Sequence, residues 1–253
     1  MAFIQCDFYS EALQCSTSIH VILPQPVGLL DPDEAVQGKI YPTLYLLHGL
    51  SDDHTVWSRR TSIERYAESY GIAVVMPAVG RSFYTDMEYG HDYFTFISHE
   101  LPKAARSMFP LSSARKDNYI AGLSMGGYGA LKTAMRHPEK FRAAASLSGA
   151  VDILERLPDF PKDFAAIFGD RPVEGSDDDL FHLATQLAQS ESPKPFIYLN
   201  CEAEDHLYAS NLRFRDHCKG IVLDIMYEEF PGNHEWGYWD QHIQRVLELF
   251  FKR

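Results

Sequence analysis

The chain has 253 residues, of which 45% are hydrophobic and 23% are charged, proportions that are usual for a globular domain. This length predicts a single domain with a large buried core. The formal net charge of −12 at pH 7 argues against nucleic acid or an anionic membrane as a partner, because both would repel the chain.

The cysteines and the N-terminal segment bear on the compartment. The four cysteines show neither a C-x-x-C pair nor the spacing of a zinc site, so we expect free thiols, with Cys201 and Cys218 packing as small apolar side chains. Residues 1–7 lack the basic and apolar regions of a secretory signal peptide, and no apolar run is long enough to cross a membrane. We therefore expect a soluble cytoplasmic protein without a membrane partner.

Apolar strand patterns alternate with helical patterns along the chain. Strands are expected over residues 2–9, 14–23, 41–47, 72–76, 119–123, 142–147, 195–200 and 221–229. Helices are expected over residues 61–70, 92–109, 125–136, 208–219 and 236–251, with Pro102 kinking or breaking the second of them. Residues 31–39 are polar and predict a loop. The alternation predicts an α/β fold in which helices cover both faces of a mostly parallel sheet.

A longer segment, residues 151–192, interrupts this alternation. It is rich in Pro and Asp, and its apolar residues favour short helices that lie over the carboxyl edge of the sheet, where α/β proteins bind their ligands. A small cap over the site and an ordinary surface excursion are equally compatible with its length. The run Asp177-Asp178-Asp179 predicts a solvated helix start rather than a calcium site.

The segment from Tyr119 to Ala130 carries the clearest functional pattern. A short strand leads through Gly122-Leu123-Ser124-Met125-Gly126 into a helix rich in alanine and leucine. In this context G-x-S-x-G predicts a nucleophile elbow, a turn so tight that side chains two residues before and after the serine would collide. The elbow would hold the Ser124 hydroxyl at the carboxyl edge of the sheet, in front of the positive end of the helix. Ser124 is therefore the predicted nucleophile.

A serine nucleophile needs a base, and His234 is the best candidate. It lies in the turn Pro231-Gly232-Asn233-His234-Glu235, after the last expected strand and before the last helix. From there a histidine can lean over the sheet edge toward Ser124. The other histidines that we weighed, His99, His137, His217 and His242, lie in helical patterns or at unsuitable ends of elements. The order serine, acid, histidine along the chain supports His234.

The acid that orients the base is predicted to be Asp205. It follows the strand over residues 195–200, in the loop that leaves its carboxyl end. Asp152, just after the preceding strand, is the alternative. Glu202 and Glu204 are expected to be solvated, and His206 is expected to point elsewhere along the chain as a surface residue.

Two backbone N–H groups are predicted to hold the oxyanion of the tetrahedral intermediate that a serine nucleophile forms. One belongs to Met125, directly after the nucleophile at the start of the helix. The other belongs to Leu50, because Gly49 lets the backbone after the strand over residues 41–47 approach closely. Trp57, Phe83, Tyr84 and Trp236 fall in loops on the same face and are candidate substrate-pocket residues, although aromatic side chains more often belong to the core.

Several of these segments together resemble a known family. Residues 48–57, the triplet Tyr84-Thr85-Asp86, the run from Gly122 to Ala130 and the run from Gly232 to Trp236 look like the "putative esterase" group of α/β-hydrolases. This group includes esterase D-type S-formylglutathione hydrolases, feruloyl and acetylxylan esterases, and bacterial tributyrin esterases, and the chain looks most similar to the last. A departure is Glu202-Ala203-Glu204, at a place where glycine is common in the group.

The resemblance implies an α/β-hydrolase fold and the same site residues: Ser124, Asp205 and His234 as a triad, with Leu50 and Met125 as oxyanion donors. It also implies hydrolysis of short-chain acyl esters through an acyl-enzyme, without metal or cofactor, by a protein that forms homo-oligomers. No zincin or phosphate-loop motif contradicts this. The alternatives are a thioesterase of the S-formylglutathione type, an acetyl or feruloyl carbohydrate esterase, and a non-catalytic binding protein on the same fold.

Overall fold

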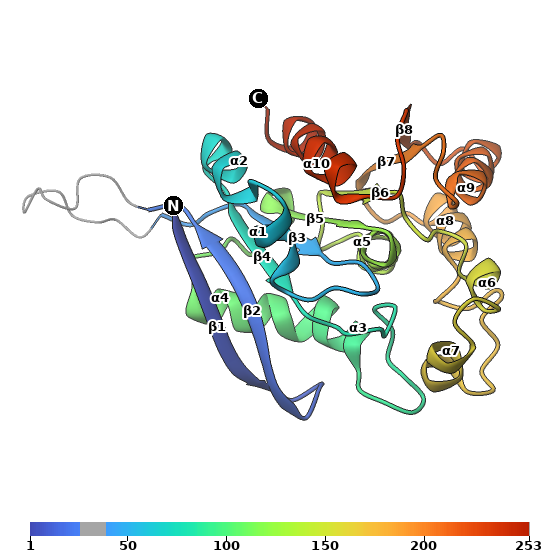
Figure 1. Ribbon diagram of the computed structural model, residues 1–253, viewed down its shortest axis with the longest axis horizontal. Helices are drawn as coiled ribbons and strands as arrows, with labels where there is room; N and C mark the ends of the chain where they lie inside the picture. Colours follow the sequence, from blue (N-terminus) through green and yellow to red (C-terminus); the bar gives the residue numbers. More distant parts are fainter. Residues whose placement is uncertain (26–38, 253) are drawn as a thin grey trace, which may run out of the picture.

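A computed structural model describes residues 1–25 and 39–252 of the chain. Within these residues, eight strands form one sheet in the order β1-β2-β4-β3-β5-β6-β7-β8 (Figure 1). The strands are β1 (Ala2–Ser10), β2 (Cys15–Leu23), β3 (Thr43–Leu47), β4 (Ala73–Pro77), β5 (Asn118–Leu123), β6 (Ala143–Leu147), β7 (Phe196–Glu202) and β8 (Met226–Phe230). The hairpin β1–β2 joins antiparallel to β4, and all other pairs are parallel. The predicted mostly parallel α/β sheet is confirmed.

The helices occupy the connections between the strands. They are α1 (Val56–Arg60), α2 (Ile63–Tyr70), α3 (Tyr93–Thr95), α4 (Leu101–Met108), α5 (Met125–Arg136), α6 (Ile153–Arg156), α7 (Pro161–Phe168), α8 (Leu180–Gln189), α9 (Tyr208–Gly220) and α10 (Trp236–Phe251). One π-helical turn, Phe96–Glu100, links α3 to α4 and ends two residues before Pro102, which lies in the first turn of α4. The missing N–H of proline fits this break, so the predicted interruption of the helix is confirmed.

The helices cover the sheet in two layers, one on each face (Figure 1). Apolar side chains of α1, α2 and α10, such as Ile63 and Ile243, form one buried cluster against the sheet. Those of α4, α5, α8 and α9, such as Leu131 and Phe214, form the other. Neighbouring residues of a central strand face opposite layers, which explains why every residue of β3 to β6 is buried.

Some boundaries differ from those expected from the sequence. The short helix α1 was not predicted, and β8 begins only at Met226, because Val222 adopts a left-handed conformation (φ 59°) in the turn that follows α9. The predicted loop over residues 31–39 lies outside the described residues except for Lys39. Cys201 and Cys218 are buried free thiols, as predicted. In the described part of the chain, no helix is both long and apolar enough to span a membrane.

The segment over residues 151–192 consists of two different parts. Helix α8 packs between α5 and α9 as an ordinary connection from β6 to β7. Helices α6 and α7 precede it at the edge of the molecule (Figure 1). The backbone N–H groups of Glu88 and Tyr89 donate to carbonyls of α7, which ties this part to the loop after β4.

Candidate active site

The turn between β5 and α5 has the geometry of a nucleophile elbow. Ser124 adopts φ 52° and ψ −118°, a strained conformation for a residue other than glycine. A Cβ on Gly122 would lie 2.4 Å from the carbonyl carbon of Gly126, and one on Gly126 would lie 2.5 Å from the carbonyl oxygen of Leu47. Both positions therefore require glycine. The backbone of Ser124 is fixed on both sides, since its N–H donates to Leu147 and its carbonyl accepts from the N–H of Ala150.

The loop after β3 lies directly against this turn. A Cβ on Gly49 would stand 3.8 Å from the Cβ of Ser124 and only 2.7 Å from a methyl group of Leu123, so the close approach depends on glycine. Within the described residues, the N–H of Leu50 has no hydrogen-bond acceptor. The N–H of Met125 belongs to the first turn of α5, where no intrahelical acceptor exists. Both N–H groups are thus available as donors.

His48 orients the Gly49–Leu50 peptide through a hydrogen bond to its carbonyl. The N–H of Val79 donates to His48 Nε2 (3.0 Å), so the ring proton is on Nδ1, which donates to the carbonyl of Gly49 (2.7 Å). Burial lowers the pKa of His48 to about 4, which keeps the ring neutral. Because carbonyl and N–H of a trans peptide point in opposite directions, this bond turns the N–H of Leu50 away from His48. Sequence analysis had missed this role.

Two of the predicted pocket aromatics support the same loop from within the core. Trp57 is 1% exposed and donates from Nε1 to the carbonyl of Leu47, while Tyr84 is fully buried and donates from its hydroxyl to the carbonyl of His48. Neither offers surface to a substrate in this structure, which corrects their expected place. Trp236 is half-buried and lies edge-to-face against Trp57. Phe83 is also buried, so Trp236 is the one of the four predicted aromatics with surface that can line a pocket.

Asp205 and His234 form a tight pair at the same edge of the sheet. Asp205 follows β7, His234 follows β8, and His234 Nδ1 lies 2.6 Å from Asp205 Oδ2. The other carboxylate oxygen accepts the N–H of Leu207 at 2.7 Å. Burial alone raises the pKa of Asp205, but these hydrogen bonds outweigh it and hold the pKa below its ordinary value. An ionised Asp205 fixes the Nδ1–H tautomer of His234 and leaves Nε2 free to accept a proton.

The two halves of the site follow strands of the same parallel part of the sheet. The strands that precede Ser124, Asp205 and His234 are β5, β7 and β8 in the contiguous order β5-β6-β7-β8. Within the described residues, the Ser124 hydroxyl makes no hydrogen bond to His234, and contacts of this kind often tighten only when substrate binds.

Comparison with known proteins identifies the family. Residues 10–249 match the model of a family described as "Putative esterase". The chain belongs to this family. The esterase is 34% identical to the "Acetyl esterase" of Caldicellulosiruptor saccharolyticus, in an alignment that covers 100% of this chain and 99% of that protein.

Two solved structures from Staphylococcus aureus extend the comparison. The fluorophosphonate-binding serine hydrolase FphF is 38% identical and superposes with a TM-score of 0.92, covering 100% of this chain and 99% of that one. The S-formylglutathione hydrolase FrmB is 37% identical with a TM-score of 0.89, and 99% of each chain is covered. The protein is therefore an α/β-hydrolase and a carboxylic ester hydrolase, as predicted.

Of three residues near Asp205, Glu202 and His206 are placed differently from expectation and Glu204 is not. Glu202 was expected to be solvated but is fully buried, because it ends β7 inside the sheet edge. Glu204 is exposed, as expected, and accepts the N–H of Gly232. His206 is on the surface with 61% of its side chain exposed, yet it does not point elsewhere: its Nδ1 lies 3.2 Å from Asp205 Oδ1.

Asp152, the alternative acid, has a structural role in the esterase. It caps α6 by accepting the N–H of Glu155 and pairs with Arg213 at 3.1 Å. Through these two contacts the carboxylate of Asp152 binds α6 and Arg213 rather than His234. This supports Asp205 as the residue that orients the histidine.

Two groups of side chains could offer ligands to a metal ion. In the described residues, ligand atoms within 4.8 Å of one another come from Asp205, His206 and His234, and from Cys201, Glu202 and Asp205. Each group contains Asp205, and the first also contains His234. An ion at the first would compete with the hydrogen bond between Asp205 and His234 and disable the base.

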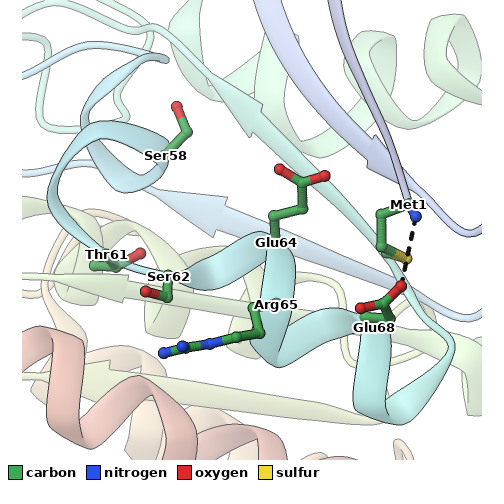
Figure 2. Close-up of a pocket in the computed structure, with 7 residues that line it drawn as sticks. All are labelled: Met1, Ser58, Thr61, Ser62, Glu64, Arg65 and Glu68. Carbon is green, nitrogen blue, oxygen red and sulfur yellow. Dashed lines mark ion pairs between the residues drawn. The ribbon is translucent and has the colours of Figure 1, made fainter.

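A cavity of about 380 Å³ lies apart from these residues, beside α1 and α2 (Figure 2). Figure 2 shows the side chains that line it, namely Met1, Ser58, Thr61, Ser62, Glu64, Arg65 and Glu68. The amino group of Met1 lies 3.6 Å from Glu68 across its rim. No predicted site residue lines this cavity, so it takes no part in the chemistry considered below.

Proposed function

We propose that the protein is a short-chain carboxylesterase that works through a triad of Ser124, His234 and Asp205. His234 Nε2 takes the proton of the Ser124 hydroxyl as its oxygen attacks the ester carbonyl carbon. Asp205 stabilises the resulting imidazolium. Collapse of the tetrahedral intermediate breaks the bond to the alkoxy oxygen, which leaves as the alcohol with the proton from His234. Water, deprotonated by His234, then attacks the acyl-enzyme, and the acid is released with Ser124 restored.

The N–H groups of Leu50 and Met125 are the proposed oxyanion donors. The charge that develops on the carbonyl oxygen forms beside Ser124, where the loop after β3 and the start of α5 meet. Donors already held in position cost no reorganisation during the reaction, and loss of one typically lowers kcat about 10²- to 10³-fold. No metal or cofactor takes part in the proposed reaction.

One observation carries the proposal. A serine held in a strained elbow stands at the same sheet edge as a buried carboxylate hydrogen-bonded at 2.6 Å to an imidazole. Strain of this kind persists only where the surrounding structure fixes it, and it is common at catalytic residues. The tight pairing with Asp205 gives His234 the tautomer that a general base needs.

Similarity favours short acyl groups as substrates. A relative that aligns with the whole chain is named an acetyl esterase, and the motifs resemble those of tributyrin esterases. The S-formylglutathione hydrolase FrmB, which matches 99% of the chain, favours a thioesterase as the second candidate. Both reactions use the same acyl-enzyme route, and they differ in the leaving group.

The remaining features of the proposal concern organisation. We propose one domain over residues 1–253, with residues 151–192 as the insertion and its helices α6 and α7 as the cap. The ring of Phe83 packs against the rings of Phe160 and Phe164, at the start and in the middle of α7. The ring centroids are 6.3 and 4.7 Å from that of Phe83. We also propose a cytoplasmic location, on the four free cysteines, and a homo-oligomeric assembly, on the resemblance to tributyrin esterases.

The test is hydrolysis of p-nitrophenyl esters of increasing acyl length by the wild type and Ser124→Ala. We expect rapid turnover of short acyl groups by the wild type and none above background by the variant. A fluorophosphonate probe should label the wild type alone, which reports the activated serine without turnover. Full activity of Ser124→Ala would refute the assignment. A wild type that hydrolyses thioesters much faster than the matching oxyesters would support the second candidate.

A further inference from the structure

Glu202 is a buried acid that the reaction described above does not use. Its side chain is fully buried at the end of β7, three residues before Asp205. One carboxyl oxygen, Oε2, accepts the hydroxyl proton of Ser148, and Ser148 Oγ in turn accepts the indole N–H of Trp239 at 3.2 Å. The other oxygen, Oε1, has no hydrogen-bond partner within the described residues.

The carboxyl group of Glu202 lies close to that of Asp205. Oxygens of the two carboxyl groups lie within 4.8 Å of each other. Asp205 is the group that stays ionised, because its oxygens already accept from His234 and from the N–H of Leu207. Two carboxylates cannot both remain charged at this distance in a buried site without a cation between them, so one of them holds a proton.

We propose that Glu202 holds this proton on Oε1 and donates it in a hydrogen bond to Asp205, as a positioning residue for the triad. The order of donation is then Trp239 to Ser148, Ser148 to Glu202, and Glu202 to Asp205, which faces His234. Asp205 thereby receives a third donor that holds its carboxylate in the orientation His234 needs. This rests on the proposed function, because it assigns Glu202 a role in that triad.

The surroundings of Glu202 support a neutral carboxyl group. The titratable groups that face it are acids: Asp205 in the following loop, Cys201 on the same strand and Tyr238 on α10. Within the described residues, it forms no ion pair with a lysine or arginine. Burial, with a smaller contribution from the charge of Asp205, raises the pKa of Glu202 to about 8, although the hydrogen bond from Ser148 acts to lower it. Loss of the proton near this pH places a second negative charge against Asp205, and repulsion disturbs its contact with His234.

The kinetic test compares pH profiles of kcat for the wild type, Glu202→Gln and Glu202→Leu. We expect the wild-type rate to fall as pH rises through about 8, since the donor to Asp205 is lost there. Glu202→Gln keeps a neutral donor at every pH and should lack this decline. Glu202→Leu has no donor and should lower kcat about tenfold with little change in KM. Glu204→Gln is the matched control in the same loop and should keep the wild-type profile.

A second measurement does not depend on turnover. In the Ser124→Ala background, infrared pH-difference spectra should show the carbonyl stretch of a buried protonated carboxyl group that disappears as pH rises through about 8. The band should be missing after Glu202→Gln. Absence of the band below this pH, or an unchanged alkaline decline in Glu202→Gln, overturns the proposal. If the wild type hydrolyses no ester at all, the proposed function fails, and the band still decides whether Glu202 is protonated.

Discussion

The two sides of the proposed active site are held by different kinds of interaction. The oxyanion side, residues 48–50 and 122–126, is held by backbone packing, and glycines there have no room for a Cβ. The acid side, formed by Glu202, Asp205 and His234, is held by titratable side chains and their hydrogen bonds. On the oxyanion side, the one titratable group is His48, whose pKa of about 4 keeps it neutral near pH 7.

This contrast teaches which changes each side tolerates. Volume limits the oxyanion side, so we expect that even one added methyl group there is damaging, while pH near neutrality has little effect. Charge and protonation limit the acid side. Substitutions there that keep the shape of the side chain and change its charge should therefore preserve the fold and lower the reaction rate. The predictions below test this difference in descending order of effect.

The largest effect is expected from Gly126→Ala on the oxyanion side. The new Cβ would lie 2.5 and 2.7 Å from the carbonyl oxygens of Leu47 and His48, both backbone atoms that cannot move without separating α5 from β3. We expect esterase activity to vanish and stability to fall by more than about 3 kcal/mol, measured by thermal unfolding. Gly220→Ala is the control, because a Cβ there meets no atom within 4 Å. Equal activity of Gly126→Ala and wild type would contradict the steric argument.

The next effect is expected from Asp205→Asn on the acid side. The amide has nearly the same shape, so the melting temperature should change little compared with the loss of rate. It cannot stabilise the imidazolium of His234 and favours the wrong tautomer, and we expect kcat to fall about 10⁴-fold. Asp152→Asn is the matched control, since its contacts are with α6 and Arg213, and it should retain kcat. A comparable loss in both variants would mean that Asp205 has no special role.

The sequence predicted what depends on local geometry or chain order. The elbow follows from the steric limits at Gly122 and Gly126, which are visible in five consecutive residues. The last helix, α10, begins and ends at the predicted residues, because its apolar spacing is regular and a turn precedes it. Asp205 and His234 were predicted from their positions in the loops after successive strands. In the structure a hydrogen bond joins their side chains.

What the sequence did not predict depends on contacts between distant segments. Glu202 can be buried because Ser148, from the loop after β6, donates a hydrogen bond to its carboxyl group. The residues next to Glu202 in the sequence resemble an exposed acidic loop, so its burial was not predicted. Trp57 belongs to the short helix α1, which was not predicted. Its buried indole donates a hydrogen bond to the carbonyl of Leu47 and packs against the ring of Trp236. Periodicity within a segment carries no information about such partners.

The smallest effect is expected at His48, which acts on the oxyanion side only through the Gly49–Leu50 peptide. In His48→Asn the side-chain amide can still donate to the carbonyl of Gly49 in place of Nδ1, whereas His48→Leu cannot. We expect kcat to fall about tenfold or less in the first variant and about 10²-fold in the second, with KM little changed, because the affected donor binds the developing oxyanion. Steady-state kinetics on a short-chain ester measure both values, and equal rates in the two variants would exclude the orienting role.

The same residue should add acid sensitivity to folding, and the sign follows from its lowered pKa. Folded His48 stays neutral down to about pH 4, while the unfolded chain takes up the proton near the ordinary value of 6.5. The stability that neutral His48 contributes is therefore complete above pH 6.5 and is lost as pH falls from there toward 4, by about 3 kcal/mol in all. The asparagine side chain of His48→Asn does not titrate in this pH range. Its unfolding free energy, measured with urea, should decline less between these pH values than that of the wild type, and parallel declines would show that His48 is accessible to protons in the folded protein.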